Sequence, residues 1–178
     1  MAKRGTKIPI ALQRGHDHRK CVTDALATAD ELCSRRGARM TTLRRRVLHL
    51  IWESHSPMGA YAIMEMLRRE GRNAMPPTVY RALDFLQEQG LVHRIASLNA
   101  FIGCTHPAET HATQYLICRR CGTVAEIENG AIGGAIAASA RELGFDMTGQ
   151  TVEIAGICRD CHEGPKGRAG AASQRHAH

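Results

Sequence analysis

The stretch that decides the fold is PPTVYRALDFLQEQG, residues 76–90. Its two prolines suit an extended approach into a first helical turn, where the missing proline N–H group is not needed. Val79, Leu83 and Leu86 then recur at helical spacing, which predicts that they form the buried face of a helix. The same spacing places three polar or aromatic side chains on the outward side: Tyr80, Arg81 and Asp84.

Helical patterns precede this stretch and a hairpin pattern follows it. Apolar side chains recur at helical spacing in three segments: residues 22–36, a segment capped by Thr41 and Thr42, and residues 60–70. The run LVHRIASLNAFIGC, residues 91–104, predicts two short strands around a turn at residues 97–99. Short helices followed by a hairpin are typical of a winged helix-turn-helix, whose last helix enters the major groove of DNA. A small helical bundle with a basic surface is the alternative.

The distribution of charge favours the DNA-binding interpretation. Residues 1–98 contain 17 Lys and Arg against 9 Asp and Glu, whereas residues 99–178 contain 7 against 8. A basic half joined to a nearly neutral half indicates that one domain meets a polyanion and the other has a different role. A solvated basic surface without a nucleic-acid partner would give the same count.

The second half is predicted to be a small α/β unit. Strand patterns at residues 110–118, 123–128 and 149–158 surround a helical pattern at residues 131–143. We therefore expect an α+β protein with an N-terminal winged helix-turn-helix domain and a small C-terminal α/β domain. The predicted parts are a flexible basic arm (1–20) that contains His16 and His18, the two domains (21–98 and 99–164) and a flexible tail (165–178).

Four of the seven cysteines form two C-x-x-C pairs, Cys118 with Cys121 and Cys158 with Cys161. An odd number of cysteines in a chain without a secretory signal argues against a disulfide framework. Each pair follows a strand pattern, and four thiolates at this spacing fit a structural zinc site. Gly122 supports a tight turn after the second thiol, where a positive φ is often required. A redox dithiol is the competing interpretation, although such pairs usually begin a helix.

Further metal-binding residue types gather near the predicted domain boundary. They are His93, Cys104, His106 and His111, together with Glu126, which follows the first cysteine pair in the sequence. A metal ion bound there would set the relative orientation of the two domains, which is a natural switch for a DNA-binding protein. Surface histidines and a solvated glutamate are the simpler alternative.

Taken together, these motifs resemble the ferric uptake regulator family, and in particular its zinc uptake branch. The resemblance covers about residues 22–163 and rests on PPTVYRALDFLQEQGLVHRI, LICRRCG and GICRDC. It implies a dimeric, metal-activated transcriptional repressor with a winged-helix domain and a dimerisation domain.

The resemblance also implies roles for single residues. Cys118, Cys121, Cys158 and Cys161 match the structural zinc ligands, and His93, Cys104, His111 and Glu126 match the zinc-sensing site. Tyr61 and Arg81 match DNA-contacting positions, and Thr78 and Tyr80 complete the predicted DNA-binding set. Glu65 and Arg68 are either an intrahelical ion pair or a contact between two dimers on one operator.

Two departures from the family pattern bear on the metal and on one contact. The histidine-rich run of iron and manganese sensors is replaced by HATQY, residues 111–115, and the thiol of Cys104 favours zinc over iron(II). The usual Thr–Pro–Gln–Arg helix start reads TTLR at residues 41–44, so the cap is retained but the proline is lost.

We therefore expect a cytoplasmic homodimeric repressor that binds palindromic operator DNA when its hinge site holds zinc and controls zinc uptake genes. It would carry two Zn²⁺ per chain, with one or two dimers per operator, and would be neither an enzyme nor a membrane protein. No apolar run in the chain is long enough to span a bilayer. A regulator of the same family that responds to iron, manganese or peroxide is the nearest alternative. A dithiol oxidoreductase and a zinc-stabilised module for protein partners are the others.

Overall fold

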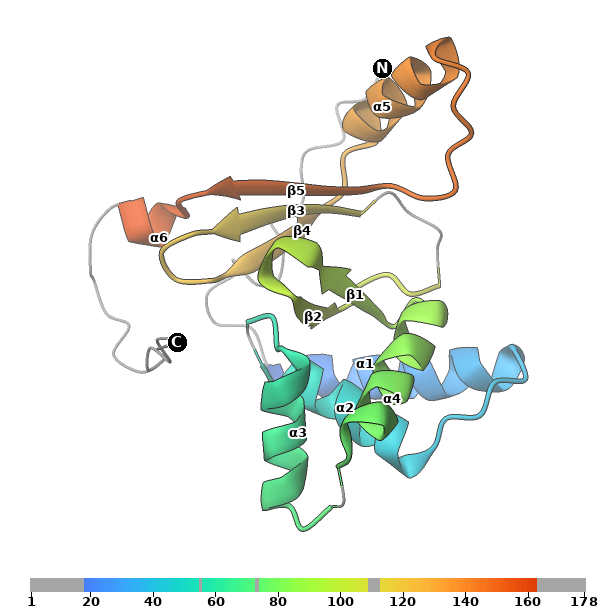
Figure 1. Cartoon of the computed structure of the whole chain (residues 1–178), viewed down its shortest axis with the longest axis vertical. Coiled ribbons are helices and arrows are strands. Elements are labelled where there is room, and N and C mark those ends of the chain that lie inside the picture. The colour runs from blue at the N-terminus through green and yellow to red at the C-terminus, as the bar shows by residue number, and fades with distance from the viewer. Residues whose placement is uncertain (1–17, 55, 73, 109–112, 163–178) are drawn as a thin grey trace.

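The computed structural model describes residues 18–54, 56–72, 74–108 and 113–162. Four helices form one end of the molecule, a two-stranded hairpin lies in the middle, and a three-stranded sheet lies beyond the hairpin (Figure 1). The helices of the first part are α1 (His18–Arg35), α2 (Thr42–Glu53), α3 (Ala60–Arg69) and α4 (Pro76–Glu88). The architecture is the expected α+β arrangement of a winged-helix part and a smaller sheet-containing part.

The first helix begins earlier than its apolar pattern predicted. α1 starts at His18 rather than at residue 22, so the last residues of the predicted flexible arm are helical. Lys20 pairs with Asp24 at 2.8 Å one turn further on, and His18 Nε2 lies 3.2 Å from the carbonyl oxygen of Glu53 on α2. Polar contacts of this kind stabilise a first turn whose first three residues are polar. His16 lies outside the described residues.

The caps and the buried face of the other helices agree with the sequence. Thr41 caps α2, because its Oγ1 accepts a hydrogen bond of 3.3 Å from the backbone N–H of Arg44. α4 begins at the prolines, and Val79, Leu83 and Leu86 are fully buried. They belong to one apolar core that all four helices share. This core holds the outward side of α4 at a defined place on the surface.

The hairpin connects the two parts of the molecule. β1 (Val92–Ile95) pairs antiparallel with β2 (Ala100–Gly103) through a 3-10 turn, η2 (Ala96–Leu98). Asn99 closes the turn at φ 46°, which asparagine tolerates better than most residues. The predicted boundary between residues 98 and 99 falls inside this hairpin, since the pairing runs from residue 92 to residue 103.

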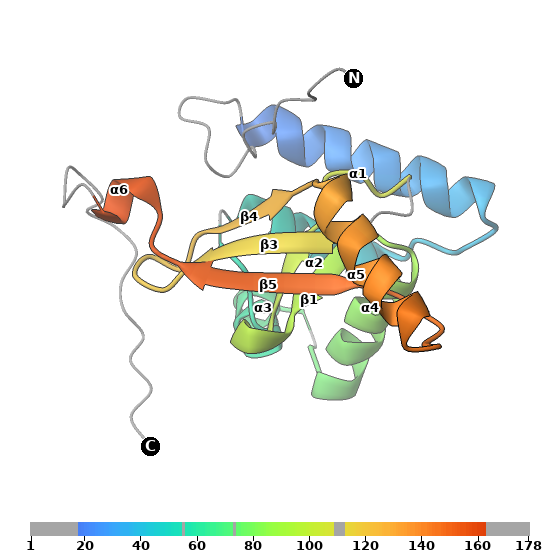
Figure 2. The same ribbon diagram turned by 90° about the horizontal axis from the view of Figure 1, so that it is seen from above.

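The second part is built on a sheet with the strand order β4–β3–β5 (Figure 2). Its strands are β3 (Thr113–Cys118), β4 (Val124–Ile127) and β5 (Thr151–Gly156), and its helices are α5 (Gly130–Glu142) and α6 (Arg159–His162). β3 pairs antiparallel with β4 and parallel with β5. No residue of α5 or β5 is buried, so neither element is covered within the protomer.

One face of the hairpin packs against the sheet, and this contact joins the two parts. Ile95 of β1 forms a small apolar cluster with Tyr115, Ile117 and Val124 of the sheet, and Ile102 of β2 packs against it. His93 shares this face of the hairpin, because it lies two residues before Ile95 and opposite Ile102. The hairpin therefore carries a metal-binding residue type into the space between the two parts.

None of the helices in the described ranges is long and apolar enough to cross a membrane.

Candidate metal centres and nucleic-acid interface

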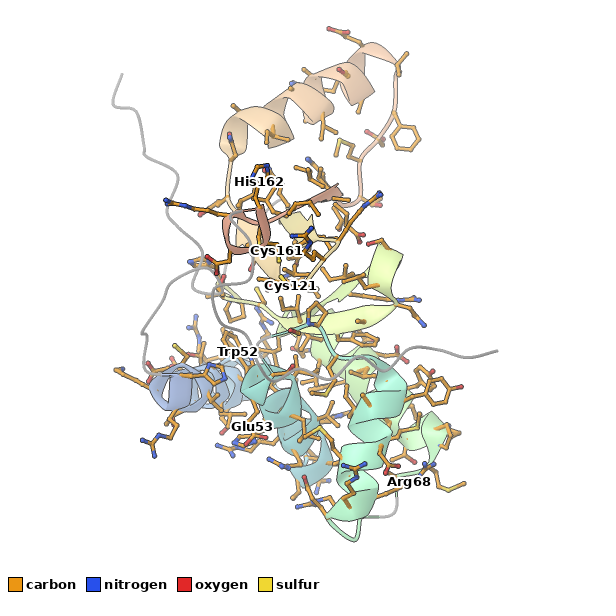
Figure 3. The ribbon with its side chains drawn as sticks, turned by 90° about the vertical axis from the view of Figure 1, so that its left-hand side faces the viewer. Trp52, Glu53, Arg68, Cys121, Cys161 and His162 are labelled. Carbon is orange, nitrogen blue, oxygen red and sulfur yellow. The ribbon has the colours of Figure 1, made fainter. Side chains whose placement is uncertain are left out.

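The four thiols of the C-x-x-C pairs meet at one end of the sheet. Cys118 ends β3 and lies opposite Gly156, which ends the parallel strand β5. The cysteine pairs that begin at or follow these strands therefore lie at the same end of the sheet. The four sulfur atoms all lie within 4.8 Å of one another, and Cys121 Sγ is 3.7 Å from Cys158 Sγ. Figure 3 shows Cys121 close to Cys161, which lies on α6. We call these residues the four-cysteine cluster.

Backbone groups prepare Cys118 of this cluster for a cation. Burial raises the pKa of the Cys118 thiol. The backbone N–H groups of Cys158, Cys121 and Arg120 lower it by more, so that the pKa is about 6. The Cys158 N–H group donates to Cys118 Sγ at 3.3 Å. Gly122 turns the chain at φ 72°, as its position after the second thiol predicted. Cys118 is thereby stabilised as a thiolate, the form that binds a structural zinc ion, whereas burial raises the pKa of Cys161 to about 12, so a cation would have to displace its proton.

A second cluster lies between the hairpin and the sheet. Ligand atoms of His93 on β1, Cys104 just after β2 and Glu126 on β4 lie within 4.8 Å of one another. We call these three residues the hinge cluster. His111, the fourth predicted member, lies outside the described residues. His106 is exposed and contacts Thr105, with its Nδ1 3.0 Å from the threonine Oγ1, and it is not part of the cluster.

The hinge cluster combines a protonated thiol with an oriented carboxylate. Burial and then the charge of Glu126 raise the pKa of Cys104 to about 12. Glu126 Oε1 is 4.0 Å from His93 Nε2, and its Oε2 accepts a hydrogen bond of 2.9 Å from Thr105 Oγ1. A bound cation would favour the thiolate of Cys104 and displace its proton. The sequence analysis did not identify Thr105, whose contact depends on how the hinge meets β4.

A tryptophan of the winged-helix part lies directly on the backbone next to this cluster. A Cβ atom placed on Gly103 would be 2.4 Å from Cε2 of Trp52, far inside van der Waals contact. Trp52 projects from α2 (Figure 3), and Gly103 immediately precedes Cys104. The indole ring therefore restricts the backbone that presents the thiol. A lone glycine in a strand can indicate such a close approach, but it does not identify the partner.

The predicted DNA-binding residues lie on the surface of α3 and α4. Tyr61 is 77% exposed in the first turn of α3, and Tyr80 is 42% exposed in α4. Thr78 and Arg81 are also exposed. These side chains are free to meet a ligand, while the opposite sides of both helices are held in the core.

The Glu65–Arg68 ion pair weighed from the sequence does not form. Glu65 pairs instead with Arg69, one turn further along the helix, whose Nε lies 3.1 Å from Glu65 Oε1. Arg68 is exposed (Figure 3) and has no ion pair among the residues that the structure describes. It remains available for a contact outside the protomer.

Comparison with known proteins gives consistent results. The family model "Ferric uptake regulator family" matches residues 35–155. The zinc uptake regulation protein of Escherichia coli (strain K12) is 37% identical over 141 residues, which cover 79% of this chain and 82% of that protein. The protein of the same name from Mycobacterium tuberculosis (strain ATCC 25618 / H37Rv) is 30% identical over 128 residues, or 70% of this chain and 95% of that one.

Solved structures show the same fold. A zinc uptake regulator complexed with zinc and DNA has a TM-score of 0.77 at 36% identity and covers 80% of this chain and 95% of its own. The crystal structure of holo XcZur has a TM-score of 0.73 at 39% identity and covers 79% of this chain and 98% of its own. By sequence and by fold, the chain belongs to the ferric uptake regulator family and, within it, to the zinc uptake branch.

Proposed function

We propose that this protein is a zinc-responsive transcriptional repressor that binds palindromic operator DNA as a dimer and controls zinc uptake genes. The observation that carries the proposal is the hinge cluster, in which residues of the hairpin and of the sheet converge at the boundary between the two parts. The relatives named as zinc uptake regulators, and the one solved with zinc and DNA, support it. The protein is a regulator rather than an enzyme, and its DNA target implies the cytoplasm.

Zinc is the ion that the donor atoms of both clusters favour. The four-cysteine cluster offers four thiols, which suit a tetrahedral structural zinc ion. The hinge cluster offers an imidazole, a thiol and a carboxylate, and the thiol of Cys104 favours zinc over iron(II) or manganese(II). We therefore propose two Zn²⁺ per chain, one structural and one regulatory. His111 is proposed as the fourth regulatory ligand on the family pattern alone.

The regulatory step follows from where the hinge ligands are attached. His93 belongs to the hairpin of the winged-helix part, whereas Glu126 belongs to the sheet. A zinc ion bound there supplies the positive charge that holds these two side chains and the Cys104 thiolate together. Without that charge, the buried thiol stays protonated and the hinge cluster no longer adds to the contacts between the two parts. The DNA-competent arrangement would then be a smaller fraction of the population, and apparent DNA affinity would fall by that fraction.

DNA contacts are proposed for Tyr61, Thr78, Tyr80 and Arg81. Arg81 lies in the exposed side of α4, where its guanidinium could donate to guanine O6 and N7 in the major groove. The excess of basic residues in the first half would supply attraction to the phosphates, and this contribution falls as salt rises.

A second copy of the chain is proposed to cover the exposed side of the sheet-containing part. Just after α5, Leu143 is 85% exposed and Phe145 is 68% exposed. On the sheet, Leu116 and Ile154 are paired with each other across β3 and β5, and both side chains are exposed. An apolar surface of this kind is typical of a protein interface. Arg68 and Glu65 stay a proposal for contacts between two dimers on one operator.

The test combines zinc counting with DNA binding. A palindromic operator is first selected from random-sequence DNA with the zinc-loaded protein. Zinc per chain is then measured after mild chelation, and operator binding is followed as free Zn²⁺, Fe²⁺ or Mn²⁺ is restored. We expect one retained zinc and a second, reversible zinc that switches DNA binding on. One zinc per chain with no effect on DNA binding would contradict the regulatory assignment, and a switch driven only by iron or manganese would move the protein to the alternative branch.

A further inference from the structure

A carboxylate on the sheet holds the turn of the hairpin. Glu153 lies on β5, and its two oxygens accept hydrogen bonds from the backbone N–H groups of Ala96 at 2.6 Å and Ser97 at 3.0 Å. The turn belongs to the winged-helix part, and the carboxylate belongs to the other part of the molecule. The contact therefore joins the same two parts as the hinge cluster.

The strand register places this carboxylate in one row with a hinge ligand. Tyr115 of β3 is paired with Glu126 of β4 on one side and with Glu153 of β5 on the other. Paired residues project from the same face of a sheet. Because the strand order is β4–β3–β5, the two carboxylates lie at opposite edges of that face, with the fully buried Tyr115 between them.

The hairpin is consequently held at two places on one face of the sheet. At one edge, His93 and Cys104 meet Glu126 in the hinge cluster. At the other edge, Glu153 meets the turn, and Ile95 packs between the two contacts in the small apolar cluster. The first contact depends on a cation, and the second uses only the protein's own backbone and one side chain.

We propose that Glu153 is a positioning residue for DNA binding, which fastens the hairpin wing to the sheet so that zinc at the hinge cluster closes the molecule in one orientation. This inference rests on the proposed function. A contact at a single point would leave the hairpin free to rotate about it, whereas two separated contacts define an angle. The bound fraction at a given operator concentration depends on how much of the protein has that angle.

The chemistry of the contact supports a role for the charge. A hydrogen bond from the Ser97 side chain and those from the backbone N–H groups of Ser97 and Ala96 lower the pKa of Glu153, although partial burial raises it. The side chain is therefore ionised near neutral pH. Hydrogen bonds to an ionised acceptor are stronger than those between neutral groups. Glutamine has the same shape, but its NH₂ group cannot accept a hydrogen bond from a backbone N–H group.

Two substitutions break the contact from its two sides. E153Q removes the charge and one acceptor without changing the volume of the side chain. A96P removes the Ala96 N–H donor, and the backbone tolerates it because Ala96 is exposed and Ile95 before it is extended at φ −89° and ψ 105°. E128Q is the matched control, since Glu128 is an exposed glutamate at the end of β4. All variants are full-length and zinc-loaded.

The measurements are the dissociation constant for the selected operator at saturating zinc and the hydrogen-exchange rate of the Ser97 amide. We expect E153Q and A96P each to weaken operator binding by about tenfold, as loss of a charge-assisted hydrogen bond implies. The double variant should be no weaker than either single variant, because both changes remove the same contact. The Ser97 amide should exchange faster in E153Q than in the wild type, and E128Q should behave as the wild type.

The outcomes separate this inference from the proposed function. Wild-type affinity and wild-type exchange in E153Q would overturn the inference alone, and so would losses that add in the double variant. If E153Q does not fold, A96P carries the same test from the hairpin side. Absence of zinc-dependent operator binding by the wild type and by E128Q would instead overturn the proposed function and the inference with it.

Discussion

The two metal-binding clusters differ in how their residues are brought together. The four-cysteine cluster takes its thiols from two short motifs at the ends of neighbouring strands of one sheet. The hinge cluster takes its donors from the hairpin, from the segment after it and from β4, and so from both parts of the molecule. The first cluster needs only the sheet, whereas the second exists only when the two parts meet. This difference suits the first to a permanent structural ion and the second to a reversible, regulatory one.

The surroundings set the protonation state of individual thiols in both clusters. Backbone N–H groups outweigh burial at Cys118 and lower its pKa to about 6, whereas burial and then Glu126 raise the pKa of Cys104 to about 12. At neutral pH the metal-free protein therefore already holds a thiolate at Cys118 and a thiol at Cys104. A cation must displace protons at both clusters, because burial also raises the pKa of Cys161 in the four-cysteine cluster to about 12. The origin of the ligands, from one part of the molecule or from both, is therefore what separates the two roles. The following substitutions test whether the clusters divide their roles in this way.

The largest effect is expected for Cys118→Ser. Structural zinc contributes on the order of 10 kcal/mol to the folding of small zinc domains, and a whole domain is typically stable by only about 5–15 kcal/mol. α5 and β5 have no buried residue of their own to compensate. We expect the second half to unfold and the dimer to dissociate, as measured by circular dichroism and sedimentation. A folded, dimeric variant with two zinc ions per chain would contradict the structural assignment.

Cys104→Ser should leave the fold intact and remove the response to zinc. Serine keeps the size of the side chain but is a much poorer zinc ligand than a thiolate. The operator affinity at saturating zinc should fall to that of the metal-free protein, with one zinc still bound per chain and an unchanged dimer. Undiminished operator affinity would show that Cys104 does not sense the metal.

Gly103→Ala should impair the hinge cluster without touching a ligand. The new methyl group would lie 2.4 Å from Trp52, and overpacking of this kind typically costs about 1–3 kcal/mol. Since Cys104 is the next residue, we expect weaker regulatory zinc binding as well as a lower melting temperature. Adding Trp52→Leu provides the control, because it removes the ring that causes the clash. A double variant no better than Gly103→Ala would contradict this explanation.

The smallest of these effects is expected for Thr105→Val. Valine has nearly the same shape but cannot donate to Glu126 Oε2, so the carboxylate loses its orienting partner. Groups that orient metal ligands typically contribute about 10- to 100-fold in affinity, and the exposure of Thr105 favours the lower end of that range. Competition with a zinc chelator measures the change, and the four-cysteine cluster in the same sample is the internal control. Loss of zinc from both clusters would indicate a general defect.

Local patterns predicted the elements of the fold well and their polar contacts poorly. The period of Val79, Leu83 and Leu86, and the cap at Thr41, each depend on residues within one or two turns, and the structure confirms them. The start of α1 was missed because the contact of His18 with Glu53 joins residues far apart in the chain. Thr105, Trp52 and Glu153 were missed for the same reason, since each acts through a partner on another element.

The sequence by itself determined the helices, the hairpin and the paired cysteines, because spacing along the chain is enough to specify each of them. The resemblance of its motifs to a known family identified the family. Only the tertiary structure decided which residues meet at the hinge and that Glu153 shares a row with Glu126. Strand order and register settle those neighbours, and both arise from how the hairpin packs on the sheet. Residues that are distant in the chain become partners only through that packing, and a local sequence pattern contains no information about it.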